Sequence, residues 1–134
     1  MATKKLTGED AVALAQSVHD LAVNLGEYKF ANWKKLTPAQ RSKLNEQQIS
    51  LFTSSSDLVT LAVGIVLDDS KTSLAGIEEA TDQAKKAIRT IKTVKKVIGI
   101  ATAAVGLAAA IASKDPGAIA KNTKALFAVA TAKV

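Results

Sequence analysis

The stretch VIGIATAAVGLAAAIAS runs from Val97 to Ser113 without a charged side chain. An apolar surface of this length is unfavourable in water, so it must be buried against another helix of the chain, against a partner chain, or in lipid. Directly before it lies a basic segment with the cations Lys85, Lys86, Arg89, Lys92, Lys95 and Lys96. The fold and the function therefore depend on what covers the charge-free stretch.

A seven-residue repeat of apolar side chains connects the two segments. One position of the repeat holds Ile77, Ala84, Ile91, Ile98, Val105 and Ala112, and the other holds Ala80, Ala87, Val94, Ala101 and Ala108. A sustained 3.5-residue period is typical of a helix that packs along one seam. It predicts one helix over residues 71–113, about 64 Å long, unless Gly99 and Gly106 mark a bend.

Three residues stand where a helix N-cap is expected. Thr7 and Thr37 are each followed three residues later by a side chain that can reach back to the cap, and Asp115 directly precedes a proline. Phe30 and Trp33 are expected to pack near the end of the first helix. The caps and the apolar spacing predict helices at approximately 8–34, 38–67, 71–113 and 116–133.

Two segments leave alternatives open. The Ser54–Asp57 run favours a kink or fraying in the second helix, because Ser and Asp side chains compete for backbone hydrogen bonds. The DDSKTS sequence between Leu67 and Leu74 favours a turn that would form an antiparallel hairpin. A continuous helix from 58 to 113 is the alternative, since the apolar spacing of 3 or 4 residues persists through the polar segment.

These features together predict an all-α fold. We expect a single domain over 1–134, formed by an elongated up-and-down bundle of about four helices with a long heptad helix and an alanine-rich C-terminal helical hairpin. Hydrophobic residues make up 48% of the chain but aromatic ones only 4%, so the helix interfaces are thin and large aromatic-lined ligand pockets are not expected. The chain has no cysteine, which excludes disulfides and cysteine-ligated metals.

The charge and the first residues bear on location. The formal net charge is +6, which weakly favours anionic partners. The start, MATKKLTGEDAV, has lysines but no apolar stretch behind them, because Glu9 and Asp10 interrupt it. No signal peptide is recognised, so we expect a cytoplasmic protein, with a signal-less secretion route or a membrane periphery left open.

No set of residues forms a catalytic pattern. His19, the only histidine, has no carboxylate at metal-ligand spacing and is expected on the surface or rim. The acidic pairs Asp68-Asp69 and Glu78-Glu79 point in different directions on a helix and are typical of helix starts. We therefore expect a protein that is not an enzyme and takes no cofactor, metal or small-molecule substrate.

Two groups of residues are candidate binding surfaces. The basic group comprises Lys85, Lys86, Arg89, Lys92, Lys95 and Lys96. These side chains are interpreted either as a solvated face or as a surface that binds anionic lipid. A nucleic-acid surface is less favoured, because no aromatic residues that could stack on bases lie between the cations. The seam for self-association or membrane contact comprises Ile91, Val94, Ile98, Ala101, Val105, Ala108 and Ala112.

The leading hypothesis is a non-enzymatic interaction or structural protein that forms a homo-oligomer or binds a helical partner through its apolar C-terminal half. The alternative is a membrane-active protein, pore-forming or peripheral, whose 97–134 hairpin engages anionic membranes. The first arm of that hairpin is shorter than the ~20 residues that span a bilayer, and Lys121 and Lys124 interrupt the second. A weaker alternative is non-specific nucleic-acid binding through the basic face of 85–96.

Overall fold

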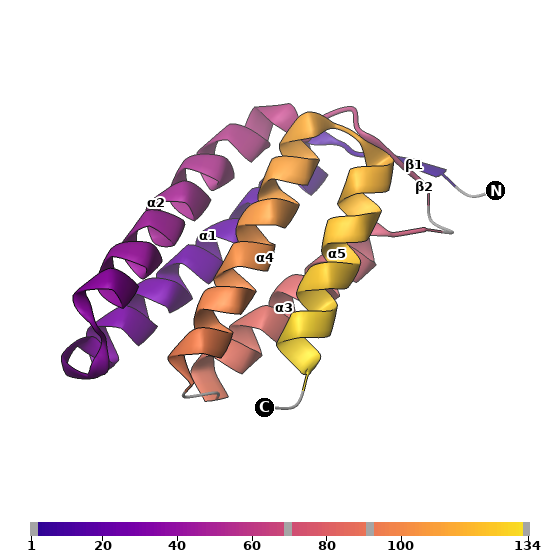
Figure 1. Ribbon diagram of the computed structural model, residues 1–134. Coiled ribbons are helices and arrows are strands. Elements are labelled where there is room, and N and C mark those ends of the chain that lie inside the picture. Colours follow the sequence, from indigo (N-terminus) through magenta and orange to yellow (C-terminus); the bar gives the residue numbers. More distant parts are fainter. Residues whose placement is uncertain (1–2, 69–70, 91–92, 133–134) are drawn as a thin grey trace.

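The computed structural model describes residues 3–68, 71–90 and 93–132, which contain five α-helices and one antiparallel two-stranded sheet (Figure 1). The strands are β1 (Thr3–Lys5) and β2 (Val66–Asp68). The helices are α1 (Gly8–Ala31), the short 3-10 helix η1 (Trp33–Lys35), α2 (Pro38–Leu61), α3 (Leu74–Thr90), α4 (Val94–Ser113) and α5 (Pro116–Thr131). The prediction of an all-α fold is confirmed, with five α-helices in the described residues where about four were expected.

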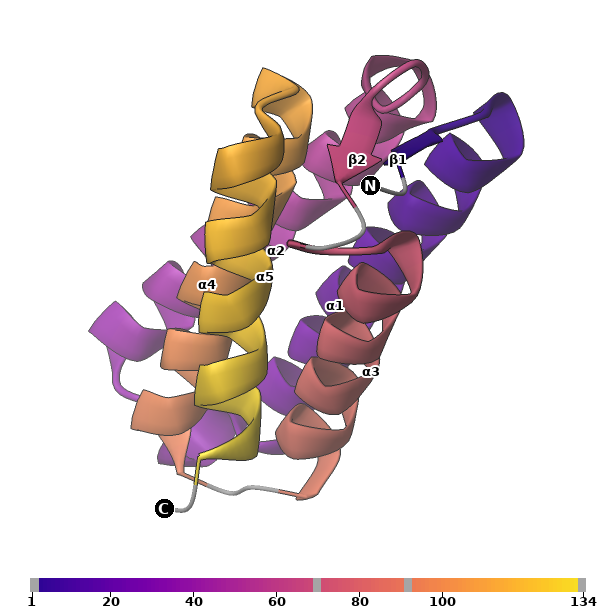
Figure 2. The same ribbon diagram turned by 90° about the vertical axis from the view of Figure 1, so that its right-hand side faces the viewer.

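Successive helices run in alternating directions, so that the α1–α2 connection and the C-terminal end of α3 lie at the same end of the molecule (Figures 1 and 2). The helix contacts close a ring in the order α1, α2, α4, α5, α3 and back to α1. The core fills this ring. Its largest fully buried side chains are Leu6, Leu14, Leu21, Leu25, Leu44, Leu51, Leu58, Leu67, Ile77, Ile100, Leu107 and Ile111.

The predicted N-caps are all present. The Thr7 hydroxyl accepts the backbone N–H of Asp10 at 3.2 Å, and the Asp10 carboxylate accepts the N–H of Thr7 at 2.9 Å. That second hydrogen bond is the main reason that the pKa of Asp10 lies below its usual value. Thr37 makes the same reciprocal box with Gln40, and the Asp115 carboxylate accepts the N–H of Gly117 at 3.0 Å.

The single long helix expected over 71–113 is wrong. Thr93 has extended backbone angles, with φ −80° and ψ 116°, and serves as the N-cap of a separate helix α4. Thr90, Ile91, Thr93 and Val94 are β-branched residues, which favour a helix less than their neighbours do. The break lets α4 turn back and pack between α2 and α5, which buries part of the charge-free stretch within the chain.

The heptad register also changes at this break. In α3 the predicted seam is buried, at Ile77, Ala80, Ala84 and Ala87. In α4 one predicted position remains buried, at Ala101 and Ala108. The other position moves back by one residue, where the buried side chains are Val97, Ala104 and Ile111.

Other helix boundaries differ from expectation as well. The expected kink at Ser54–Asp57 is wrong, because α2 is continuous to Leu61 and the Ser55 hydroxyl bonds within the helix to the Phe52 carbonyl at 2.8 Å. The predicted turn before α3 is confirmed in its described residues, and the continuous helix from 58 is wrong. The second helix ends before 67, the first ends at Ala31 rather than 34, and the last ends at Thr131 rather than 133.

The small sheet was not expected from the sequence. β1 pairs with β2 in antiparallel register, with Lys4 opposite Leu67. The chain reaches this register through Gly64, whose φ of 87° is rarely adopted by residues with a side chain. The sheet fixes the N-terminal residues against the end of α2 and buries Leu6 and Leu67 in the core.

Lys114 is the one described residue other than glycine with a positive φ, 63°, and it caps the C-terminus of α4. A side chain in this left-handed conformation costs about 1 kcal/mol, which glycine avoids. We expect Lys114→Gly to raise the free energy of unfolding by roughly 0.5–1 kcal/mol, because the greater entropy of glycine in the unfolded chain offsets part of the gain. Urea denaturation followed by circular dichroism measures this change.

Lys121→Gly is the matched control, since Lys121 is an exposed residue inside α5. It should lower the free energy of unfolding by about 1 kcal/mol. If both substitutions destabilise the protein equally, the left-handed cap at Lys114 is wrong.

Candidate functional site

The predicted basic residues do not share one helical face. Lys85, Lys86 and Arg89 belong to α3, whereas Lys95 and Lys96 belong to α4, and Lys92 lies outside the described residues. The expected face required an unbroken helix through Thr93. Because the chain reverses direction there, these cations are distributed over two antiparallel helices.

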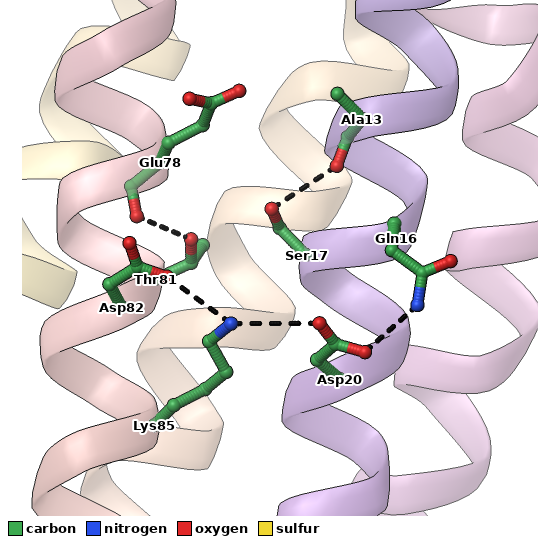
Figure 3. Close-up of polar contacts among 8 residues, drawn as sticks. All are labelled: Ala13, Gln16, Ser17, Asp20, Glu78, Thr81, Asp82 and Lys85. Carbon is green, nitrogen blue, oxygen red and sulfur yellow. Dashed lines mark hydrogen bonds and ion pairs between the residues drawn. The ribbon is translucent and has the colours of Figure 1, made fainter.

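Two of these cations are already engaged by the chain. Lys85 lies between α3 and α1, with its Nζ atom 3.2 Å from a carboxylate oxygen of Asp82 and 3.6 Å from one of Asp20 (Figure 3). Lys96 donates a hydrogen bond to the carbonyl of Ala132 after α5. Lys86, Arg89 and Lys95 are exposed and make no ion pair with any described residue.

The predicted seam is mostly covered by the chain itself. Ala101 and Ala108 are buried, Ile91 lies outside the described residues, and the others pack partly buried against the core, namely Val94, Ile98, Val105 and Ala112. From 93 to 132, Phe127 is the one large apolar side chain that is exposed, at 39%. The C-terminal half therefore offers little apolar surface to a partner.

Within the described residues, α4 is the one helix long and apolar enough to cross a membrane, with a mean hydropathy of 1.8 over its best window. The central helix of a bundle has the same composition. In this structure 44% of that window is buried inside the chain, where α4 contacts α2 and α5.

Phe30, the most exposed large apolar side chain in the described residues, lies at the end where α1 meets α2, and Trp33 follows it three residues later. Phe30 is 85% exposed and Trp33 is 47% exposed. Both were expected to pack at the end of the first helix, and for Phe30 this is wrong because of its position on the helix. Tyr28 is buried, and Phe30 follows it by about 200° around the axis, so Phe30 must point away from the core.

Arg41 on α2 contacts both the backbone and the side chain of Trp33 at this end of the bundle. Its Nε atom donates to the Trp33 carbonyl at 2.9 Å, and a terminal guanidinium nitrogen donates to the same oxygen. The guanidinium carbon lies 4.3 Å from the centre of the indole ring, within the range of a cation–π contact. One face of the indole is thus covered by a cation, while Phe30 is left without cover.

Cations surround these two aromatic residues. Lys34 and Lys35 lie in η1 and are exposed, and neither makes an ion pair with a described residue. By contrast, the Lys29 ammonium is bound to α2, where it donates to Asn45 and Gln48 at 3.0 Å each. We refer to the surface made by Phe30, Trp33, Lys34, Lys35 and Arg41 as the tip.

The tip continues toward α3. A pocket between α1 and α3 is lined by Ala31 and Asn32, which also line the hollow at the tip, and by Arg89. Among the predicted basic residues that the structure describes, Arg89 is the one that lines this pocket. Burial raises the pKa of the Tyr28 hydroxyl in the same pocket, so this group is neutral at physiological pH.

His19 lies elsewhere, on the outer side of α1. It is exposed, and its ring meets Phe52 edge to face at a centroid distance of 5.1 Å. Among the residues described, no three His, Asp or Glu side chains come close enough together to hold a metal ion.

The tip was missed in the sequence because its residues were assigned to packing. The signal that could have identified it is FANWKK, residues 30–35, where two aromatics three residues apart directly precede two lysines. Aromatic and basic residues in such proximity are typical of surfaces that meet a membrane interface.

Comparisons of this chain with protein-family models, with curated proteins and with solved structures find no match in any of the three.

Proposed function

We propose that this chain is a non-enzymatic protein that docks on anionic membrane surfaces through the tip. The observation that carries the proposal is the 85% exposure of Phe30 beside the half-exposed Trp33, at an end of the bundle that also presents Lys34 and Lys35. An exposed aromatic pair is unfavourable in water and favourable at the headgroup level of a bilayer. The adjoining cations supply attraction to anionic lipids.

The expected strength follows from the size of these groups. Burying a phenylalanine side chain contributes about 1.5–3 kcal/mol. Each lysine close to an anionic membrane adds about 1 kcal/mol. The tip is therefore suited to reversible association, and it needs no rearrangement of the core, because Phe30 and Trp33 are exposed in the folded chain.

The same observations favour docking at the tip over docking through the C-terminal half. Self-association or helical-partner binding through the seam would use Ile98, Val105 and their neighbours, which are partly covered by the core. Release of the 97–134 hairpin into lipid would first expose the core residues Ile100, Leu107 and Ile111. Both remain weaker proposals, since docking at the tip requires neither partner-induced repacking nor unfolding.

Nucleic-acid binding is also a weaker proposal for this surface. Stacking of successive bases needs several open aromatic faces, whereas the tip offers only Phe30 and one face of Trp33, because Arg41 covers the other. A shift of the Trp33 fluorescence by duplex or single-stranded nucleic acid, without any shift by anionic vesicles, would favour this class instead.

Trp33 is the only tryptophan, so its fluorescence reports directly on the tip. With vesicles of phosphatidylcholine and phosphatidylglycerol at low salt, we expect a blue shift of the emission and reduced quenching by acrylamide, because the indole enters the interface. Vesicles of phosphatidylcholine alone should give a much weaker effect. Phe30→Ser should weaken association with the anionic vesicles about tenfold or more, measured by co-sedimentation.

The control is Val63→Ser, since Val63 is 43% exposed beyond the end of α2, at the opposite end of the bundle from the tip. It should bind vesicles as the wild type does. The proposal fails if the wild type does not sediment with anionic vesicles at low salt, or if Phe30→Ser binds as strongly as the wild type.

Lys34 and Lys35 test the electrostatic part separately. Lys34→Gln and Lys35→Gln should each weaken binding to anionic vesicles about fivefold, because each removes about 1 kcal/mol of attraction. The differences should shrink as salt is raised. Lys121→Gln, which removes an exposed charge from α5, is the charge-matched control, and an equal loss of affinity there would show that only the net charge matters.

A further inference from the structure

A pocket between the start of α3 and α5 has a volume of about 460 Å³, within the roughly 300–1,000 Å³ of many small-ligand sites. α3 contacts α5 in the ring of helices, and Figure 2 shows the chain that leads into α3 passing α5. The start of α3 is the end away from the tip, so membrane docking does not use this pocket (Figure 1). Its walls are formed by Lys71, Thr72, Ser73, Gly76 and Glu79 around the start of α3, and by Thr123, Lys124 and Phe127 on α5.

Thr72 is the unusual member of this pocket. It is only 9% exposed, and its hydroxyl makes no hydrogen bond with any described residue. A buried polar group without a partner is costly, so such groups usually meet a water or a ligand. The unpaired amide of Asn24 is closed to solvent, whereas the Thr72 hydroxyl is not closed and belongs to a residue that lines the pocket. Thr72 thus offers an unused hydroxyl to a molecule in the pocket.

A second hydroxyl lies beside that of Thr72. The Ser73 Oγ accepts the backbone N–H of Gly76 at 3.0 Å, which leaves the serine O–H available as a donor. A Cβ atom on Gly76 would lie 3.3 Å from the Ser73 Oγ and 3.8 Å from the Thr72 Oγ1. Both hydroxyls therefore border the space that the glycine leaves open, and both can donate to one group there.

The charges around these hydroxyls favour an anion. Lys71 precedes α3 and Lys124 lies on α5, and both are exposed and line the pocket. Neither makes an ion pair with a described residue. The N-terminus of α3 adds the positive end of the helix dipole. Hydroxyl and ammonium donors from two elements suit the several oxygens of a phosphate group.

The remaining walls indicate what the phosphate is attached to. The exposed Glu79 follows Gly76 by three residues, about one turn further along the same face of α3. Its carboxylate would repel inorganic phosphate but would accept hydrogen bonds from hydroxyl groups on an attached carbon skeleton. Phe127, which is 39% exposed, offers an apolar surface to the same skeleton. A phosphate ester of a sugar fits these walls better than inorganic phosphate does.

We infer that the pocket between the start of α3 and α5 binds a sugar phosphate. The phosphate contacts the hydroxyls of Thr72 and Ser73 and the two lysine ammonium groups, and a sugar hydroxyl donates to Glu79. The sugar phosphate is either free or part of a mononucleotide, and the first experiment separates these two sources. This inference is independent of membrane docking at the tip.

The first experiment titrates the protein with four probes, namely ribose 5-phosphate, adenosine monophosphate, inorganic phosphate and ribose. The backbone amide of Gly76 in proton–nitrogen correlation spectra reports binding. Ribose 5-phosphate should bind with a dissociation constant below roughly 1 mM and about fivefold or more tightly than inorganic phosphate, and ribose should not bind detectably. Tighter binding of adenosine monophosphate than of ribose 5-phosphate identifies a mononucleotide, and equal or weaker binding identifies a free sugar phosphate. Equal binding of ribose 5-phosphate and inorganic phosphate would show an adventitious ion only and would overturn the inference.

Thr72→Val and Lys124→Gln test the contacts with the phosphate. Each should weaken binding of ribose 5-phosphate about tenfold, because each removes a hydrogen bond to a charged group. Lys121→Gln makes the same change of charge on α5 outside the pocket and should bind as the wild type does. Circular dichroism checks that all three variants are folded. The inference is wrong if neither Thr72→Val nor Lys124→Gln binds more weakly than Lys121→Gln.

Glu79→Gln tests the contact with the sugar separately. It should strengthen binding of inorganic phosphate, because it removes a negative charge from the wall of the pocket. It should also reduce the advantage of ribose 5-phosphate over inorganic phosphate to about twofold or less, because an amide oxygen is a weaker acceptor than a carboxylate. If that advantage is as large in Glu79→Gln as in the wild type, the assignment of the sugar to Glu79 is rejected.

Discussion

The packing of leucines between α1 and α2 is the interaction on which the other features depend. Leu44, Leu51 and Leu58 recur every seven residues on α2 and are fully buried. Their α1 counterparts, Leu14, Leu21 and Leu25, are equally buried, so the antiparallel pair is locked in one register. The same register determines which side of α1 faces the core at its last turn. Phe30 lies on the side of α1 that faces away from the core, so the packing of the core leaves Phe30 exposed at the tip.

This arrangement also explains how a charge-free stretch from Val97 to Ser113 is accommodated in a single chain. α2 and α5 cover α4 on its two flanks, and small residues allow α5 to approach closely. A Cβ atom on Gly106 would lie only 2.9 Å from Oδ1 of Asn122 on α5. The proposed function therefore leaves the apolar hairpin packed against the rest of the chain and uses the tip, which is not part of the core.

Much of the fold could be predicted from the sequence, because capping and apolar spacing are local. Thr7, Thr37 and Asp115 marked three helix starts correctly. The break before Val94 could not be predicted in this way, since the apolar repeat continues across it and the β-branched residues around it disfavour a helix only slightly. β1 could not be predicted from a local sequence pattern either, because it pairs with β2, whose residues lie far away in the chain.

The candidate site was predicted less well than the fold. Of the predicted cations in the described residues, Arg89 alone lines the pocket next to the tip, whereas Lys85 pairs with Asp20 on another helix. The sequence could not show this, because an ion pair between α3 and α1 depends on the tertiary fold. Nor could it show that the amide of Asn24 is buried without a partner. The exposure of Phe30 could have been inferred from its angle to Tyr28, because the helix predicted over 8–34 contains both residues.

The central claim is that the folded bundle docks by the tip while α4 stays in the core. Hydrogen exchange followed by mass spectrometry, with and without anionic vesicles, tests this claim most directly. The account predicts that vesicles slow exchange in residues 30–36 and leave the protection of residues 94–113 unchanged. It is contradicted if residues 30–36 exchange as in the free protein while the protection of residues 94–113 changes.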